Sequence, residues 1–216
     1  MRRLAVGLAV AILGLLLPAM AQASQASGNL VPLGNLMPAA QAAAPVPPGF
    51  VSFCMRFAGQ CITDKSQAAT VTLTPSVWNE LEQVNDDVNR AITPQDDQVH
   101  YGRAEYWTIP TDGRGDCEDY ALTKRATLIA AGVPARALRM AVVKTWRGEG
   151  HAVLTVATDH GDYVLDNMVQ NVRSWDNTGY QWVERQDPNN VWAWVSLTPG
   201  ASPPRLVAAS GASRHG

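Results

Sequence analysis

The sequence contains no run of more than two basic residues, and its 216 residues carry a formal net charge of −2. Proteins that bind nucleic acid need clustered Lys and Arg side chains to neutralise the phosphates. The charge pattern therefore indicates that nucleic acid is not a partner of this protein.

A run of apolar residues long enough to span a membrane is also missing. The longest one, Leu4–Leu17, falls short of the ~20 residues that a spanning helix requires. It follows Arg2 and Arg3 and precedes Ala-Gln-Ala at 21–23, an order typical of a secretory signal with its cleavage site. We interpret residues 1–23 as a signal peptide and expect no stable membrane span after its removal. An uncleaved membrane anchor is the alternative interpretation.

Cysteine is scarce: the chain has only Cys54, Cys61 and Cys117. In an oxidising compartment the two that are close in sequence can close a short loop, which leaves Cys117 unpaired. Three free thiols are the alternative. An unpaired thiol in an exported protein is either buried and inert or kept free for its reactivity, so its neighbours decide between the two.

Charged residues are absent from 24–48, where Ala, Gln, Pro and Gly dominate, and Pro45, Pro47 and Pro48 argue against a regular element. This segment is expected to be a disordered arm. The end of the chain, 199–216, is again small and polar and is expected to be a disordered tail. Residues 49–198 remain, a length typical of one domain with one hydrophobic core.

Two helices are predicted inside this domain. Thr74 is a capping residue and Pro75 suits the first helical position, and apolar residues follow at helical spacing as far as Ile92. A second helix is expected from about Asp116 to about Ala131, where a glycine and a proline supply stop signals.

After Pro134 the pattern changes to strands separated by turns. The strands are expected at 135–145, 151–158, 163–167, 180–185 and 191–197. Consecutive strands joined by short turns form an antiparallel sheet, so the predicted fold is α+β with helices packed on an antiparallel sheet.

Three residues along this order have the chemistry of a cysteine nucleophile and its base. Cys117 is predicted in the first turn of a helix, where the partial positive charge of the helix end stabilises a thiolate. His151 opens a strand, and Asp166 ends the next one, so a hairpin can bring the carboxylate to the imidazole. Taken singly, each has an ordinary structural alternative, and His100 is a rival for the base.

Carboxylates flank the cysteine at Asp116, Glu118 and Asp119. Negative charge is stabilising at a helix N-terminus, which is one explanation for them. Three carboxylates within four residues also repel one another and offer the oxygen ligands that suit calcium, so a metal site is the second explanation.

These motifs together resemble the signature of the bacterial transglutaminase-like cysteine proteinases. The stretches that carry the resemblance are Phe53–Arg56 with Cys61, Tyr101-Gly102, Glu105–Trp107, Gly113–Ala121, Gly150–Leu154 and Tyr163–Asn167. The resemblance implies a papain-like, transglutaminase-like core and the catalytic triad Cys117, His151 and Asp166. It also implies Ca²⁺ bound by the three flanking carboxylates, and, by analogy with animal transglutaminases, an oxyanion contact from the Trp107 indole.

The function implied by the resemblance is peptide-bond hydrolysis by an exported thiol protease in the periplasm. The best-understood member of the family cleaves a large surface adhesin and so releases cells from biofilms. A protein substrate, of which such an adhesin is one example, and a membrane-anchored regulator are the partners implied. Acyl transfer to amines is an alternative because the same triad serves both reactions, and a non-catalytic periplasmic binding module with a vestigial triad is another.

Overall fold

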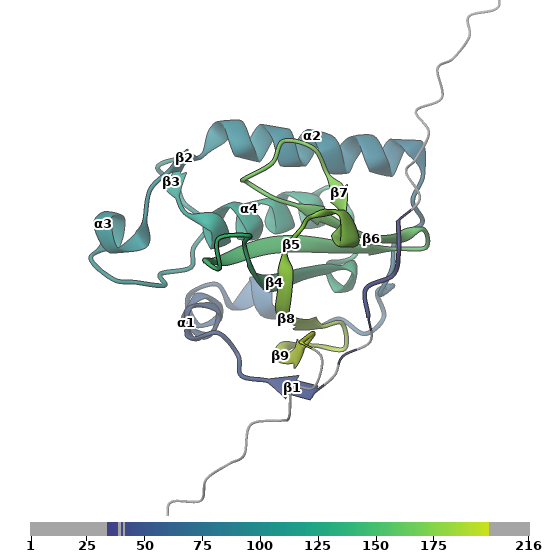
Figure 1. Ribbon diagram of the computed structural model, residues 1–216, viewed down its shortest axis with the longest axis horizontal. Coiled ribbons are helices and arrows are strands. Elements are labelled where there is room, and N and C mark those ends of the chain that lie inside the picture. The colour runs from purple at the N-terminus through teal and green to yellow at the C-terminus, as the bar shows by residue number, and fades with distance from the viewer. Residues whose placement is uncertain (1–33, 39, 41, 199–216) are drawn as a thin grey trace, which may run out of the picture.

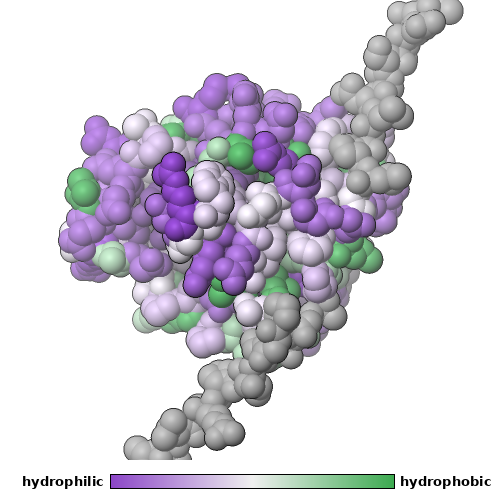
Figure 2. All heavy atoms as spheres, viewed as in Figure 1, coloured by the Kyte–Doolittle hydropathy of each residue, from purple (hydrophilic) through white to green (hydrophobic). Residues whose placement is uncertain are grey.

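The computed structural model describes residues 34–38, 40 and 42–198 of the chain (Figure 1). The predicted signal peptide 1–23 and the predicted tail 199–216 lie outside the described residues. None of the helices in the described part is long and apolar enough to cross a membrane. The face drawn in Figure 2 is mostly hydrophilic, and its hydrophobic residues are scattered in small groups.

The described residues form helices, strands and short 3₁₀ turns. The α-helices are α1 (Pro48–Arg56), α2 (Pro75–Ala91), α3 (Asp97–Tyr101) and α4 (Cys117–Ala130). The strands are β1 (Ala42–Ala44), β2 (Thr93–Pro94), β3 (Arg114–Gly115), β4 (Leu138–Lys144), β5 (Gly150–Thr158), β6 (Gly161–Leu165), β7 (Arg173–Ser174), β8 (Gln181–Asp187) and β9 (Asn190–Ser196). The 3₁₀ turns are η1 (Ala58–Cys61), η2 (Ala135–Ala137) and η3 (Trp175–Asn177).

Seven strands form one antiparallel sheet in the order β1-β9-β8-β4-β5-β6-β7. Helix α4 packs against β5 and β4, and α2 in turn packs on α4, so α4 lies between α2 and the sheet (Figure 1). The prediction of an α+β fold with helices on an antiparallel sheet is confirmed.

Helix α2 begins where its sequence predicts. The Thr74 hydroxyl oxygen accepts a hydrogen bond from the Val77 N–H, and Pro75 occupies the first turn, where its missing N–H costs nothing. The apolar residues at helical spacing form a buried stripe that includes Leu81 and Val88. That stripe attaches the helix to the core.

The two faces of the sheet bury different clusters, because successive side chains of a strand point to opposite faces. Met140 and Leu154 belong to the main core under the helices. Val143 and Val153 belong to a smaller cluster on the other face, which Trp182 and other aromatic side chains cover.

The arm predicted to lack regular structure contains a strand. Ala42–Ala44 form β1, which pairs with Trp194–Ser196 of β9 at the edge of the sheet. The prediction was wrong for these residues because the alanines precede the prolines and can pair, whereas Pro45 lacks the N–H that a longer ladder would need. Helix α1 also begins inside the arm, at Pro48.

The Cys54–Cys61 disulfide is present and joins α1 to η1, with the two Cα atoms 5.6 Å apart. That separation lies within the range that a disulfide bridges. The predicted pairing is therefore confirmed. Cys117 is the free cysteine among the described residues.

Leu128 of α4 has no exposed surface, whereas Leu36 is 69% exposed, and the two provide a matched pair of substitutions. We expect Leu128→Ala to lower the free energy of unfolding by about 2–5 kcal/mol, because it leaves a cavity between α4 and its neighbours. Leu36→Ala should change it by less than about 0.5 kcal/mol. Urea denaturation of both variants checks this, and equal effects would contradict the assignment of the core.

Candidate active site

The segment before the cysteine is held by a small parallel ladder between β2 and β3. The Gln95 N–H donates to the Gly115 carbonyl, and the Thr93 N–H donates to the Gly113 carbonyl. Gly113 has φ +72°, which favours glycine, and a Cβ on Gly115 would collide with the Asp119 carboxylate. The glycines therefore let this segment lie against the start of α4.

Cys117 is the first residue of α4, as predicted, with Asp116 at the N-cap. Its thiol donates a hydrogen bond to Glu118 Oε2 at 2.9 Å, and its sulfur accepts one from the Ala152 N–H at 3.4 Å. The second contact joins the beginning of α4 to β5, the strand that carries His151.

Strand register places His151 and Asp166 on the same face of the sheet. Strand β5 pairs with β6 through Leu154 and Leu165, so Asp166 follows the last paired residue and lies diagonally across from the histidine. The His151 Nε2 lies 2.8 Å from Asp166 Oδ1, and both side chains are buried. The hairpin geometry expected from the sequence is therefore present.

The Asp166 carboxylate has further donors. Its Oδ1 also accepts a hydrogen bond from the Met168 N–H, and its Oδ2 accepts one from the Tyr180 hydroxyl. Burial alone would raise the pKa of Asp166, but the hydrogen bond and charge of His151, with these other donors, hold it below its usual value. The aspartate is thus kept ionised, which is the state that orients an imidazole.

Cys117 and His151 line one cleft, which contains about 860 Å³ of empty space including solvent at its open mouth. Its other lining residues are Pro47, Pro48, Glu105, Trp107, Glu118, Val142, Gly150, Ala152 and Glu184. Because His151 Nε2 is bonded to Asp166, Nδ1 is the ring nitrogen left for the thiol. The rival base His100 is bonded through Nε2 to Asp112 at 2.8 Å and is not among the lining residues.

The surroundings of the thiol favour its neutral form. Burial raises the pKa of Cys117 well above its usual value, and the neighbouring Glu118 carboxylate raises it further, while the Ala152 N–H acts against this. Burial, followed by the charge of Asp116, raises the pKa of Glu118 to about 9. Negative charge beside the sulfur therefore opposes the stabilisation that the helix N-terminus provides.

Three carboxylates form a compact group beside the cysteine. Asp97, Asp116 and Glu118 each offer an oxygen within 4.8 Å of the others. Asp97 Oδ1 and Asp116 Oδ1 are buried with no hydrogen-bond partner among the described residues. Burial, followed by the charge of Asp116, raises the pKa of Asp97 to about 6. An all-oxygen group with buried, unpaired acceptors fits a hard cation such as calcium.

The composition of this group differs from the set that sequence reasoning selected. Asp116 and Glu118 belong to it, but Asp119 lies outside it and accepts a hydrogen bond from the Thr108 N–H at 2.7 Å. Asp97 takes part instead, and no motif in its own segment marks it. The β2–β3 ladder brings it to Asp116, whose Oδ2 accepts a hydrogen bond from the Asp97 N–H.

Trp107 lines the cleft, but its indole N–H is already used: it donates to Glu105 Oε2 at 3.0 Å. The backbone of Glu105 has φ 58°, which is uncommon for a residue other than glycine. An oxyanion contact from this indole would require Glu105 to release it.

Tyr180 is a site residue that sequence reasoning did not select. Its hydroxyl donates to Asp166 Oδ2, and its ring lies edge-on to the His151 ring with the centroids 5.6 Å apart. Burial, with the contact to Asp166, raises the pKa of this phenol, so it remains a donor. Tyr180 is the first residue of the strand predicted at 180–185, where an aromatic residue usually belongs to the core, and nothing in the sequence linked it to Asp166.

A partly buried thiol at a helix start, in one cleft with an imidazole bonded to a carboxylate, is the arrangement of a cysteine hydrolase. The family model described as bacterial transglutaminase-like cysteine proteinase matches residues 40–202, and the chain belongs to this family. It is a transglutaminase-like cysteine peptidase. The matched range contains the predicted domain 49–198 and also β1. No curated protein sequence matches the chain.

Solved structures of LapG from Legionella pneumophila are similar to this chain. Calcium-bound LapG is 27% identical, with 58% of this chain and 72% of that chain covered and a TM-score of 0.49. A second LapG structure is also 27% identical, with 55% and 67% covered and a TM-score of 0.48. EGTA-treated LapG is 26% identical, with 56% and 68% covered and a TM-score of 0.48.

Tyr180 offers a test of how the imidazole is positioned. We expect Tyr180→Phe to lower kcat about tenfold with little change in KM, because the loss of one hydrogen bond to a charged group loosens Asp166 rather than substrate binding. The acidic limb of the pH–rate profile should move to higher pH, because the phenol helps to keep the Asp166 pKa low.

The matched control is Tyr120→Phe, which removes a hydroxyl that donates to the Ile92 carbonyl away from Asp166. It should lower stability without moving the pH profile. Identical kinetic effects of the two variants would show that Tyr180 has only a structural role.

Proposed function

We propose that Cys117, His151 and Asp166 are a catalytic triad that hydrolyses peptide bonds in a protein substrate. The observation that carries the proposal is the cleft shared by the thiol and the imidazole, with the imidazole bonded to a buried carboxylate. Membership of a cysteine peptidase family supports the assignment of the reaction.

In the proposed mechanism His151 Nδ1 accepts the proton of the Cys117 thiol as the sulfur attacks the scissile carbonyl. The imidazolium then donates that proton to the leaving amine, and a thioester remains. Water, deprotonated by the same nitrogen, hydrolyses the thioester and restores the thiol. Asp166 keeps its contact with Nε2 throughout and stabilises the imidazolium.

Stabilisation of the oxyanion is assigned to the beginning of α4. The first backbone N–H groups of a helix have no intrahelical acceptor, and the Cys117 N–H is one of them. The Trp107 indole lines the same cleft and would become a second donor if it exchanged Glu105 for the substrate oxygen.

Calcium is proposed at the group formed by Asp97, Asp116 and Glu118. The unpaired buried oxygens and the repulsion among the three carboxylates support a cation there. Bound calcium would supply positive charge that offsets the negative charge beside the thiol. Glu118 would help to hold the cation, and the thiol proton would then be left to His151.

Export to the periplasm is proposed from the signal pattern of residues 1–23, and the Cys54–Cys61 disulfide supports an oxidising compartment. The substrate is proposed to be a protein of the cell surface, with an adhesin as the expectation that the family resemblance gives, and release of cells from a biofilm as its consequence. A membrane-anchored regulator is proposed on the same resemblance.

The triad is tested by Cys117→Ala and His151→Ala. Each should lower kcat/KM by about 10³-fold or more and leave the circular dichroism spectrum unchanged, because each removes a reacting group without disturbing the core.

Comparing the surface and secreted proteins of cells that express wild type or Cys117→Ala should reveal a fragment that only the wild type releases. Activity of folded Cys117→Ala within tenfold of wild type would rule out the mechanism, and incorporation of an added amine into the substrate would assign acyl transfer instead.

The calcium site is tested by titration calorimetry on the metal-stripped protein. We expect Asp97→Asn and Glu118→Gln each to weaken calcium binding about tenfold or more, because each removes a charged oxygen ligand. Chelation should lower turnover more than it unfolds the domain.

Two matched variants separate the structural alternatives. Asp119→Asn should leave the calcium affinity unchanged, because this carboxylate lies outside the group. Asp87→Asn should also leave it unchanged, because this exposed carboxylate on α2 pairs with Arg90. If the protein keeps full activity in excess chelator and calorimetry detects no heat of calcium binding, the calcium site is ruled out. The carboxylates would then serve only to stabilise the helix start.

A further inference from the structure

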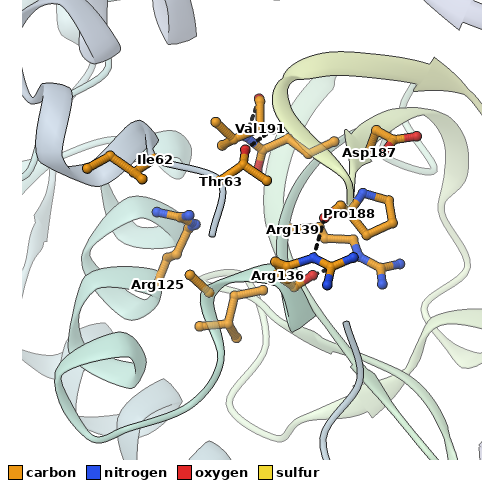
Figure 3. A pocket seen from close by; sticks show the side chains of 11 residues that line it. Ile62, Thr63, Arg125, Arg136, Arg139, Asp187, Pro188 and Val191 are labelled. Carbon is orange, nitrogen blue, oxygen red and sulfur yellow. Dashed lines mark hydrogen bonds between the residues drawn. The ribbon is translucent and has the colours of Figure 1, made fainter. Parts of the chain in front are cut away.

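A second pocket lies at the opposite end of β4 from the catalytic cleft. It contains about 280 Å³ of empty space, which includes solvent at its open mouth, and lies among η2, the middle of α4 and the turn between β8 and β9 (Figure 3). Its lining residues are Ile62, Thr63, Arg125, Ala135, Arg136, Leu138, Arg139, Gln186, Asp187, Pro188 and Val191. None of them takes part in the proposed catalytic mechanism.

The pocket is positively charged, although the chain as a whole is slightly acidic. Arg125, Arg136 and Arg139 reach it from α4, η2 and β4, and Asp187 is the one acidic lining residue. The Asp187 carboxylate accepts a hydrogen bond from the Asn189 N–H within its own turn. One carboxylate against three guanidinium groups leaves a net positive lining.

Arg125 has the least compensated of these charges. It is only 4% exposed, its Nη1 donates to the Gln60 carbonyl, and its Nε has no partner among the described residues. Burial lowers its pKa to about 10, and no carboxylate acts against that. A buried guanidinium without a counter-charge destabilises the folded state, and a ligand that supplied the counter-charge would offset this.

The other two arginines are fixed but not neutralised by their hydrogen bonds. Arg136 makes four hydrogen bonds: Nε donates to the Pro188 carbonyl (Figure 3), Nη1 donates to two further backbone carbonyls, and Nη2 donates to Asn189 Oδ1. Arg139 Nη2 donates to the Ala69 carbonyl. Burial, followed by the charge of Arg185, lowers the pKa of Arg139 to about 10, while Asp162 and Asp187 act against this. Carbonyl acceptors hold the forks in place and leave their charge available to a ligand.

We propose that this pocket binds a free tetrahedral oxyanion of the size of inorganic phosphate or sulfate. The Arg125 Nε–H is a buried donor with no partner among the described residues, and Arg136 and Arg139 add positive charge to the same lining. Thr63 adds a hydroxyl, which accepts from the Val191 N–H and keeps its own proton free to donate. An anion bound here supplies the counter-charge that Arg125 lacks and ties α4 to the β8–β9 turn.

The proposal is tested on the wild-type protein with sodium sulfate and sodium phosphate, using sodium chloride and sodium acetate at the same ionic strength as references. Saturation with either oxyanion should raise Tm by about 3 °C or more, because a ligand that binds only the folded state stabilises it. In NMR spectra the Arg125 Nε–H resonance should move on titration with sulfate.

The variant Arg125→Met should lose the response to sulfate. It should still fold, because replacing an uncompensated buried charge by an apolar side chain of similar length is often neutral or stabilising. Arg139→Gln, a second variant, should weaken the response, and Arg90→Gln on the exposed side of α2 should retain it. An equal rise of Tm in Arg125→Met, an equal rise with acetate, or an unmoved Arg125 Nε–H resonance would overturn the proposal.

Discussion

The packing of α4 against β5 is the interaction on which the active site depends. Leu122 and Leu128 are fully buried between the sheet and α2, so the helix has one position along the strand. The contact between the Ala152 N–H and the Cys117 sulfur then joins the start of the helix to the start of the strand. Once this contact fixes the helix start beside β5, the register of β5 with β6 determines where His151 and Asp166 lie. The three residues are far apart in sequence and are brought together by two pairings.

Helix α4 carries unbalanced charge at two places. Carboxylates at its start raise the pKa of Cys117, and its middle holds Lys124 and Arg125, which are buried without an ion pair among the described residues. Burial lowers the pKa of Lys124 to about 7, and the charge of Asp166 acts against this. A cation at the first turn and an anion beside Arg125 would offset these charges, whereas Lys124 does not line the pocket of Arg125. The two proposed ligands, a cation and an anion, would each offset charge carried by this one helix.

Much of the fold follows from local sequence patterns. The parts that do not follow from them are set by partners distant in the sequence. Thr74-Pro75 and the stripe of apolar residues after it specify α2, and the glycines before Cys117 specify the start of α4. The proposed triad could be identified from the sequence because each member lies at the end of an element whose boundary the sequence marks. Asp97 and Tyr180 could not, because each reaches the site through a tertiary pairing: the β2–β3 ladder for the first, and the strand β8 beside β4 for the second. Strand β1 was missed because alanine gives no strand signal without its partner β9.

The position of β1 has a practical consequence for any shortened form of the protein. Pro47 and Pro48, which follow it, line the catalytic cleft, and Ala44 pairs with Trp194 in the core beside Phe50. A recombinant chain trimmed to begin at Gly49, the first residue of the domain as the sequence alone delimits it, would expose the β9 edge and open one wall of the cleft. An unpaired edge strand is a template for association between copies. The shortest useful chain therefore begins before Ala42.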